Sequence, residues 1–430
     1  MTKGLCVFTL IICIALIVIL CKPKGRNTVY LQIQDVPNDA RYPMTIQDIK
    51  DILKEKKVIR ILAAGHTSNG TTNAHDGELQ VDVKKMVTED VEPVTDQLWK
   101  INAMHTFGQI YLQLREHLVD LPVKPDCDHL TLGGVLSAGG FGYDSIKNGS
   151  LMDNIQSFEL LLPTGEQITC TNDHELFYLA LSGFGRFGII TSCTMYVTKN
   201  IYRSARRLIF GDDHEAFFTA LKQLAFNDQV DFLYCHNDLH KKNENMYCLT
   251  YGRNFSLASE AIPLTEQDYG QTTSSHIPWT YKTEFSPKKV EGVGVTTEFI
   301  FPDIHAIVEL DDYVRHNYPY DKCPLYIFPI KNVTTKYPLH TLSPSYFPPH
   351  IPLLWGYGMY HYDFDEQFYK ELLHICIRSG GRPYLWGHHK ITQQERETIY
   401  TKTTLDYISQ KKREIDPYNI LNPVDFPSLD

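Results

Sequence analysis

The strongest structural signal in the chain comes from residues 58–70, VIRILAAGHTSNG, and from residues 130–142, LTLGGVLSAGGFG. The first stretch opens with a β-branched apolar run, which predicts a buried strand that leads directly into a glycine-containing loop. The second holds five glycines within thirteen residues. Glycine-rich turns carry little side-chain bulk, so they can bring several backbone N–H groups onto one anionic group. Together the two stretches predict an anion-binding site built from main chain.

Helices and strands alternate around these stretches. The spacing of apolar residues predicts helices over 46–55, 107–118 and 175–181, strands over 79–83, 97–101 and 189–197, and a hairpin from 157–163 and 167–171. From about residue 200 onward, aromatic residues and prolines become frequent. Helices are expected there over 213–225 and 305–314, and one charged helix over 393–412. The change in composition predicts a second domain.

Composition and charge exclude two classes of protein. The chain of 430 residues is 43% hydrophobic, which excludes an intrinsically disordered protein. Its net charge is −10, and its first 26 residues hold four basic residues and no acidic one, so the remainder carries 37 minus 51, or −14. Phosphate contacts need a basic surface. We therefore expect no nucleic-acid partner.

An uncharged apolar run occupies residues 4–21, GLCVFTLIICIALIVILC. About 20 apolar residues span a bilayer as a helix, so this run predicts an N-terminal transmembrane anchor. The alternative is a cleaved signal peptide, although no small-residue cleavage site follows the run. We expect a single-pass membrane protein, with a secreted protein as the second reading.

Two further motifs carry less information. Residues 183–188, GFGRFG, match GxGxxG, but a dinucleotide site of that type follows a strand and opens a helix. Here a helix is predicted before the glycines and a strand after them, so we expect a plain turn. His388 and His389 are expected at the surface. Neither histidines nor cysteines show the spacing of metal ligands, so no metal site is expected.

Four segments, 61–70, 130–142, 154–164 and 175–190, resemble in order and spacing the FAD-binding domain of the vanillyl-alcohol-oxidase superfamily. Cytokinin dehydrogenases are the nearest look-alike, with berberine-bridge-type and aldonolactone oxidases behind them. The resemblance implies an α+β fold with a two-lobed, PCMH-type FAD-binding domain. It spans residues 28–200 and is completed by 376–430, with an α+β substrate domain, 201–375, inserted between the two parts.

The resemblance also implies roles for particular residues. His66 takes the position of the family's covalent flavin attachment, and Cys127 that of a second, cysteinyl link. Asp126 takes the position of the aspartate that cytokinin dehydrogenases use towards the substrate amine, which predicts a catalytic base. Gly140 falls where a small residue governs the access of oxygen to the flavin. The complete set of expected FAD contacts is Ala63, Ala64, Gly65, His66, Thr67, Ser68, Asn69, Gly70, Cys127, Thr131, Gly133, Gly134, Ser137, Gly140, Phe141, Ile189 and Asn422.

The function that this resemblance implies is oxidation of a CH–OH or CH–NH group of a small molecule by hydride transfer to FAD. Oxygen or another electron acceptor would then reoxidise the cofactor. The alternative is a catalytically silent, membrane-anchored flavin-binding or interaction protein. It is supported by Ala63 in place of the family's glycine or arginine, and by Tyr384 in place of a histidine. Because the inserted region matches no known pattern, the substrate stays open between amine, sugar alcohol and lactone.

Overall fold

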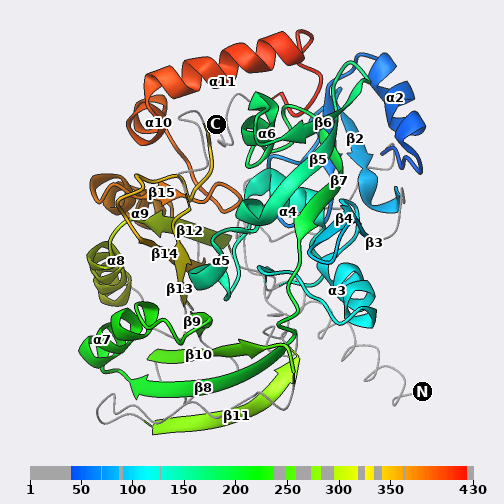
Figure 1. Ribbon diagram of the computed structural model, residues 1–430. Helices are drawn as coiled ribbons and strands as arrows, with labels where there is room; N and C mark the ends of the chain where they lie inside the picture. The colour runs from blue at the N-terminus through cyan, green and yellow to red at the C-terminus, as the bar shows by residue number, and fades with distance from the viewer. Residues whose placement is uncertain are drawn as a thin grey trace, which may run out of the picture.

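The computed structural model describes residues 40–68, 70–86, 91–125, 127–236, 247–257, 273–281, 295–317, 325–333, 341–361 and 365–423. The chain folds into an N-terminal lobe and a second lobe built on one large sheet, here called the large-sheet lobe (Figure 1). The expected anchor, residues 4–21, lies outside the described residues, as do Asn69 and Asp126. Among the residues that are described, no helix is long and apolar enough to cross a membrane.

The N-terminal lobe combines a two-stranded parallel sheet with a five-stranded antiparallel sheet in the order β3-β4-β7-β5-β6. Its strands are β1 (Ile59–Leu62), β2 (Leu79–Asp82), β3 (Glu92–Pro93), β4 (Leu98–Asn102), β5 (Ile155–Leu161), β6 (Gln167–Thr171) and β7 (Ile189–Tyr196). Its helices are α2 (Ile46–Lys54), α3 (Phe107–Glu116), α4 (Leu132–Ala138), α5 (Ser145–Asn148) and α6 (Glu175–Ala180), with 3-10 turns η1 (Val83–Lys85) and η2 (Leu151–Asn154). The predicted elements of this region are confirmed to within two residues at each end.

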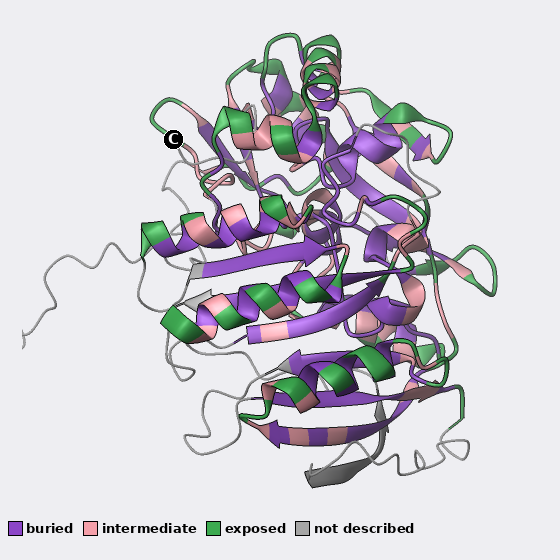
Figure 2. Cartoon of the chain, turned by 90° about the vertical axis from the view of Figure 1, so that its left-hand side faces the viewer, coloured by how far each residue is buried: buried purple, intermediate pink, exposed green. Residues whose placement is uncertain are grey.

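The large-sheet lobe is an antiparallel sheet of eight strands in the order β11-β8-β10-β9-β13-β14-β12-β15. The strands are β8 (Tyr202–Gly211), β9 (Phe232–His236), β10 (Tyr247–Phe255), β11 (Thr273–Tyr281), β12 (Val295–Phe301), β13 (Leu325–Lys331), β14 (Leu353–His361) and β15 (Arg382–Pro383). Three helices pack on it: α7 (His214–Ala225), α8 (Ile304–Asn317) and α9 (Glu366–Arg378). Figure 2 shows them in front of the sheet with exposed outer and buried inner faces, the pattern of amphipathic helices that cover a core.

The C-terminal region corrects one expectation. The expected single helix over 393–412 is two helices, α10 (Gln393–Tyr400) and α11 (Lys402–Ile415). They are separated at Thr401, whose φ of 63° cannot continue a right-handed helix and whose side chain caps α11.

The segment expected to return to the first domain, 376–430, begins within α9, and its strand β15 pairs with β12 of the large sheet. Its contact with the N-terminal lobe is made further on, by α11, where Tyr407 donates a hydrogen bond of 2.7 Å to Glu175 of α6.

Buried contacts of two kinds join the lobes directly after the second glycine stretch. The ring of Tyr143 stacks on Tyr234 of β9 with 3.6 Å between centroids. Asp144 accepts two hydrogen bonds of 2.8 Å from the guanidinium of Arg203 on β8, and both side chains are buried. A buried pair with this geometry holds its two elements together, because separating it would leave uncompensated charge.

Candidate functional site

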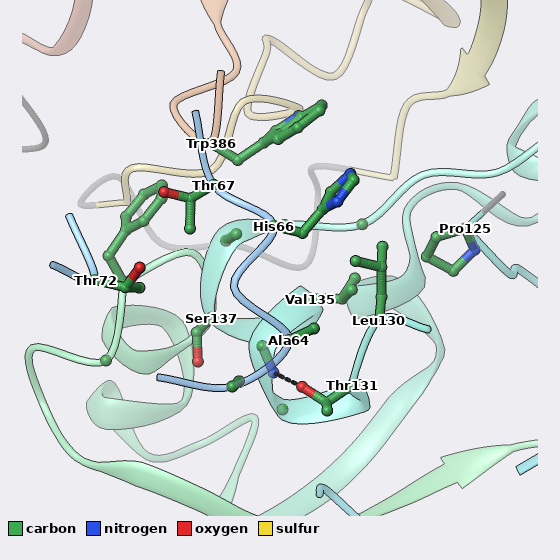
Figure 3. A pocket seen from close by; sticks show the side chains of 18 of the residues that line it. Ala64, His66, Thr67, Thr72, Pro125, Leu130, Thr131, Val135, Ser137 and Trp386 are labelled. Atoms are coloured by element: carbon green, nitrogen blue, oxygen red, sulfur yellow. Dashed lines mark hydrogen bonds between the residues drawn. The ribbon is translucent and has the colours of Figure 1, made fainter. Parts of the chain in front are cut away.

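A cavity of about 230 Å³ lies between the two lobes. On one side its wall consists of residues from three glycine-containing loops of the N-terminal lobe, together with neighbouring side chains of that lobe. On the other side it consists of side chains from the large-sheet lobe and the segment after β15. Figure 3 shows the junction, where His66 projects from the first loop beside Trp386, and Val135 and Ser137 project from α4.

The first loop begins where strand β1 ends. Residues 63–67 line the cavity, and Gly65 has φ of 69°, a left-handed conformation that glycine adopts without steric cost. Asn422, near the C-terminus, fixes the entry to this loop. Its Oδ1 accepts the backbone N–H of Ile61 at 3.1 Å, and its Nδ2 donates to the carbonyl of Phe184 at 2.7 Å. One side chain therefore ties the first loop to the loop at residues 183–188.

The second glycine stretch forms α4 and the segment that follows it. Thr131 caps the helix, since its Oγ1 accepts the backbone N–H of Gly134 at 3.3 Å. A Cβ at Gly134 would lie 3.3 Å from the Cβ of Ala63, so the two glycine-rich loops approach closely here. A Cβ at Gly133 would lie 3.1 Å from the carbonyl oxygen of Ala103. Gly133 is thus required by close approach to the main chain at Ala103, and Gly134 by the side chains of Thr131, whose Oγ1 would lie 2.8 Å from a Cβ, and Ala63.

The loop at residues 183–188 has the predicted context, with α6 before it and β7 after it. It is nevertheless part of the site, because Phe184, Gly185 and Gly188 line the cavity. Phe184 has φ of 54° and Gly185 φ of 68°, left-handed conformations that are costly outside glycine. The sequence carried a signal for this loop, the three glycines, but its departure from the dinucleotide pattern led us to expect only a turn.

The structure brings most of the sequence-predicted residues to one cavity. Those on its wall are Ala63, Ala64, Gly65, His66, Thr67, Cys127, Thr131, Gly133, Gly134, Ser137, Gly140, Phe141, Ile189 and Asn422. Ser68 and Gly70 are not among the lining residues. The buried Ser68 instead donates its backbone N–H to the carbonyl of Trp386 at 2.9 Å, which fastens the first loop to the opposite wall.

Gly140 lies on the cavity wall, as does Val135 of α4. A Cβ at Gly140 would lie 2.6 Å from Cγ1 of Val135 and 3.1 Å from the Cβ of Leu151. The absent side chain of Gly140 therefore accommodates close packing at the edge of the cavity, and its expected role in the access of oxygen stays a prediction.

His66 sits at the meeting point of the two walls. Its ring stacks on Trp386 with 5.4 Å between centroids and 15° between planes, and its Nδ1 lies 3.3 Å from Nε2 of His129. Burial, and then the neighbouring His129, lower the pKa of His66 to about 4. The imidazole is therefore neutral at pH 7 and carries a lone pair on one ring nitrogen.

The large-sheet lobe contributes Glu298, a residue that the sequence reading did not single out. Glu298 lies on β12, is buried, and lines the cavity. Its Oε2 accepts hydrogen bonds from Tyr326 Oη at 2.9 Å and from Trp386 Nε1 at 3.0 Å. A carboxylate held by two neutral donors in an enclosed site can accept a proton from a bound molecule. An isolated glutamate in a strand pattern gave no signal for this role.

Aromatic rings surround this carboxylate. Tyr326 and Phe328 of β13 stack at 6.1 Å, and Phe141 meets Tyr384 edge to face at 5.2 Å. The hydroxyl of Tyr384 donates to the carbonyl of Gly139 at 2.5 Å. Burial, and the nearby charge of Glu298, raise the pKa of Tyr384 well above its usual value, so the hydroxyl stays protonated and keeps this bond.

The expectation that His388 and His389 lie at the surface is wrong. Both are buried, directly behind the cavity wall that Tyr384 and Trp386 form. His389 bonds the carbonyl of Tyr384 at 3.1 Å and Thr297 Oγ1 at 3.3 Å. Burial, and then His388, lower the pKa of His389 to about 3. Adjacent histidines predicted exposure because they are polar, whereas neutral imidazoles that bond main chain are compatible with a core.

The family match covers the part of the chain that carries the first two glycine-rich loops. Residues 39–171 match the family described as an FAD binding domain. Cytokinin dehydrogenase 3 of Arabidopsis thaliana is 26% identical over 219 residues, which cover 46% of this chain and 40% of that relative. Cytokinin dehydrogenase 2 of the same plant is 30% identical over 167 residues, covering 36% and 32%. An uncharacterized oxidoreductase in the fasciation locus of Rhodococcoides fascians is 28% identical over 162 residues, covering 36% of each chain.

The chain thus spans less than half the length of the curated relatives it matches. The matched part includes the first two glycine-rich loops and Phe141, whereas Glu298, Phe328 and Trp386 lie beyond residue 171.

Proposed function

We propose that the protein is an FAD-linked oxidoreductase that oxidises the CH–NH group of a small apolar amine. The proposal is supported by the match of residues 39–171 to the FAD binding domain family and by the similarity of the chain to cytokinin dehydrogenases. The observation that carries the proposal is the buried carboxylate of Glu298 on the wall that faces the glycine-rich loops. When bound, FAD supplies a two-electron acceptor for hydride.

The lining residues fit FAD. Gly65, Gly133 and Gly134 put main chain on the wall, which suits a diphosphate bound by backbone N–H groups. The hydroxyls of Thr67, Thr131 and Ser137 lie on the same wall and can bond ribityl or phosphate oxygens. We propose that FAD attaches covalently to His66, and that Cys127, also on the cavity wall, provides a second link.

Glu298 would act on the proton of the substrate. Loss of hydride from an N-bearing carbon leaves a cation unless the N–H proton leaves as well. Glu298 Oε2, held by Tyr326 and Trp386, is positioned to accept that proton. Asp126, expected from the sequence to be the base, lies outside the described residues, so Glu298 is the candidate carboxylate among the described residues that line the cavity.

The wall around Glu298 favours an amine over a sugar alcohol or a lactone. The rings of Phe141, Phe328, Tyr384 and Trp386 line the cavity together with Glu298 and pack against one another in sequence. Burying an alcohol hydroxyl without a partner costs about 1–3 kcal/mol, so a polyol would lose several such bonds on this wall. An amine with one N–H donor and an apolar body suits one carboxylate among aromatic rings. The relatives' name, cytokinin dehydrogenase, points to substrates of that class.

The test is to mix FAD-loaded protein in oxygen-free buffer with a cytokinin, benzylamine, sorbitol and a sugar lactone, each in turn. We expect the visible absorbance of the flavin to bleach with an amine and not with sorbitol. Failure of the protein to bind FAD would refute the proposal as a whole. Protein that holds FAD yet is bleached by none of the four would support the catalytically silent reading. Bleaching by sorbitol or the lactone alone would overturn the substrate class.

Membrane attachment through residues 4–21 is a separate proposal. It is supported by the length and apolar character of that run. Fractionation of the full-length chain against a chain lacking residues 4–21 tests it. Recovery of both in the soluble fraction would contradict an anchor.

A further inference from the structure

Strand β14 carries two glycines that its backbone conformation does not require. Gly356 and Gly358 are buried and lie two residues apart, so they share one face of the sheet. Neither has the positive φ that would favour glycine. Glycine inside a strand weakens it and often marks a place where another group approaches closely. The reason for these two glycines must therefore lie in what packs over the strand.

Two aromatic rings of the neighbouring strand β13 occupy that place. In the sheet register Tyr326 stands opposite Gly358, and Phe328 stands opposite Gly356. A Cβ on Gly358 would overlap Cζ and Oη of Tyr326, and a Cβ on Gly356 would lie 2.5 Å from Cζ of Phe328. These atoms form the far end of each ring, and the two rings are nearly parallel, with 9° between their planes. Both rings therefore lean across β14 towards β12.

The row that contains Gly358 ends at the carboxylate. Glu298 of β12 pairs with Gly358, so Tyr326, Gly358 and Glu298 form one row across three strands. Tyr326 Oη donates a hydrogen bond of 2.9 Å to Glu298 Oε2. Neighbouring strands lie about 4.8 Å apart, so this bond joins residues about 10 Å apart in the sheet, over a middle residue that has no side chain. In the next row Gly356 pairs with Ile300, which has no acceptor on its side chain.

From this arrangement we propose that Gly358 and Gly356 are positioning residues of the substrate cavity. Gly358 admits the ring of Tyr326, whose hydroxyl then orients the carboxylate of Glu298. Gly356 admits the ring of Phe328, which keeps that ring against the sheet and leaves space for the body of the substrate. The three side chains line the cavity, whereas the two glycines do not. The inference rests on the proposed amine oxidation and deepens it, because it assigns the aim of the base and the size of the substrate to different residues.

The packing part of the inference is tested without substrate, by thermal unfolding of the full-length protein. We expect Gly358→Ala to lower the unfolding temperature by about 2–5 °C through overpacking. In a Tyr326→Ala background the same change should cost nothing, because the methyl group then occupies the space that the ring has left. If Gly358→Ala does not fold, a double variant that folds supports the same conclusion. Equal losses in the two backgrounds, or a double variant that does not fold, would overturn the inference.

The catalytic part is tested by stopped-flow reduction of the flavin in oxygen-free buffer with saturating benzylamine. Gly358→Ala should slow reduction by about 10- to 100-fold, the effect of losing one hydrogen bond to a charged group. Tyr326→Phe keeps the ring without its hydroxyl and should be equally slow. The two changes combined should be no slower than either alone, because both remove the same bond. Multiplied effects in the combined variant would show that Gly358 does not act through Tyr326, and would overturn the inference.

Gly356→Ala is the matched control, since it adds the same methyl group to the same face of the same strand. It should leave reduction by saturating benzylamine within about threefold of wild type. The half-saturating concentration should rise about tenfold more for a bulky cytokinin than for benzylamine, because the displaced ring of Phe328 narrows the cavity. Slowing equal to that of Gly358→Ala would overturn the division between the two glycines. Wild-type protein that no amine reduces would refute the proposed function, while the unfolding measurements would still decide what the glycines accommodate.

Discussion

The N-terminal lobe contributes the glycine-containing loops to the cavity, through residues 63–67, 133–134 and 184–185, here called the main-chain wall, whereas the large-sheet lobe and the segment after β15 contribute the side-chain wall, chiefly Glu298 and Trp386. A main-chain wall can bind a cofactor whose recognition depends on backbone N–H groups and close approach. A side-chain wall can change its chemistry by single substitutions without altering the sheet behind it. We therefore expect substitutions on the main-chain wall to affect FAD binding, and substitutions on the side-chain wall to affect the reaction with substrate.

The largest effect is expected at Glu298. Glu298→Gln keeps the shape of the side chain but removes the proton acceptor, so flavin reduction by an amine substrate should slow by about 10²–10⁴. FAD affinity should be unchanged, because Glu298 belongs to the side-chain wall. Stopped-flow reduction in oxygen-free buffer measures the rate. Asp126→Asn is the comparison: a large loss there with none in Glu298→Gln would return the role of base to Asp126.

The second prediction concerns acid stability of the side-chain wall. The pKa of His389 is lowered to about 3. An unfolded histidine titrates near 6.5, so below that pH the unfolded state binds a proton that the folded state excludes. Stability should therefore fall as pH drops from about 6.5 towards 3, by about 2 kcal/mol from this residue alone at pH 5.

Urea unfolding at pH 7.5 and pH 5 measures this loss in the wild type and in His389→Gln. The variant should lose less stability than the wild type between the two pH values. The same substitution at the exposed His75 is the control. An equal loss in His389→Gln and wild type would show that this buried imidazole is not the source.

A smaller effect is expected from a matched pair of glycines. Gly185 and Gly380 have φ of 68° and 67°, so alanine strains the backbone equally at both, by about 1–2 kcal/mol. At Gly185 the new Cβ would lie 2.7 Å from Nδ2 of Asn422, whereas at Gly380 it meets nothing within 4 Å. Displacing Asn422 loosens the first loop from the 183–188 loop.

We therefore expect both variants to lose similar stability, but only Gly185→Ala to lose FAD affinity, by about tenfold. Titration of apo-protein with FAD measures the affinity, and thermal unfolding measures the stability. If Gly380→Ala weakens FAD binding as much, the main-chain wall is sensitive to general destabilisation and the role assigned to Asn422 is wrong.

The smallest effect on chemistry is expected at Gly140. Gly140→Ala places a methyl group against Val135 and Leu151, which should cost about 1–3 kcal/mol of stability through overpacking. Reoxidation of reduced flavin by oxygen should change by less than about twofold per folded molecule, because the atoms nearest the new methyl group belong to Val135 and Leu151. A tenfold slowing of reoxidation in Gly140→Ala, without a matching loss of stability, would instead support the expected role of Gly140 in the access of oxygen.

The sequence alone predicted most of the N-terminal lobe and most of the main-chain wall. Strand β1 followed by Gly65, and α4 with Gly133 and Gly134, are local patterns in which a few consecutive residues dictate a turn or a close approach. The break between α10 and α11 at Thr401 was missed, because polar helices that follow one another have continuous composition and only the backbone conformation separates them.

Only the tertiary structure decided the other wall. Glu298 on β12, Tyr326 on β13 and Trp386 after β15 converge because the large sheet places distant segments beside one another, and a sheet register is a long-range property. The burial of His388 and His389 and the pairing of His129 with His66 depend on the same long-range packing. Local residue patterns thus predicted the loops that we propose to hold the cofactor, whereas the side chains of the opposite wall came together through contacts between segments far apart in sequence.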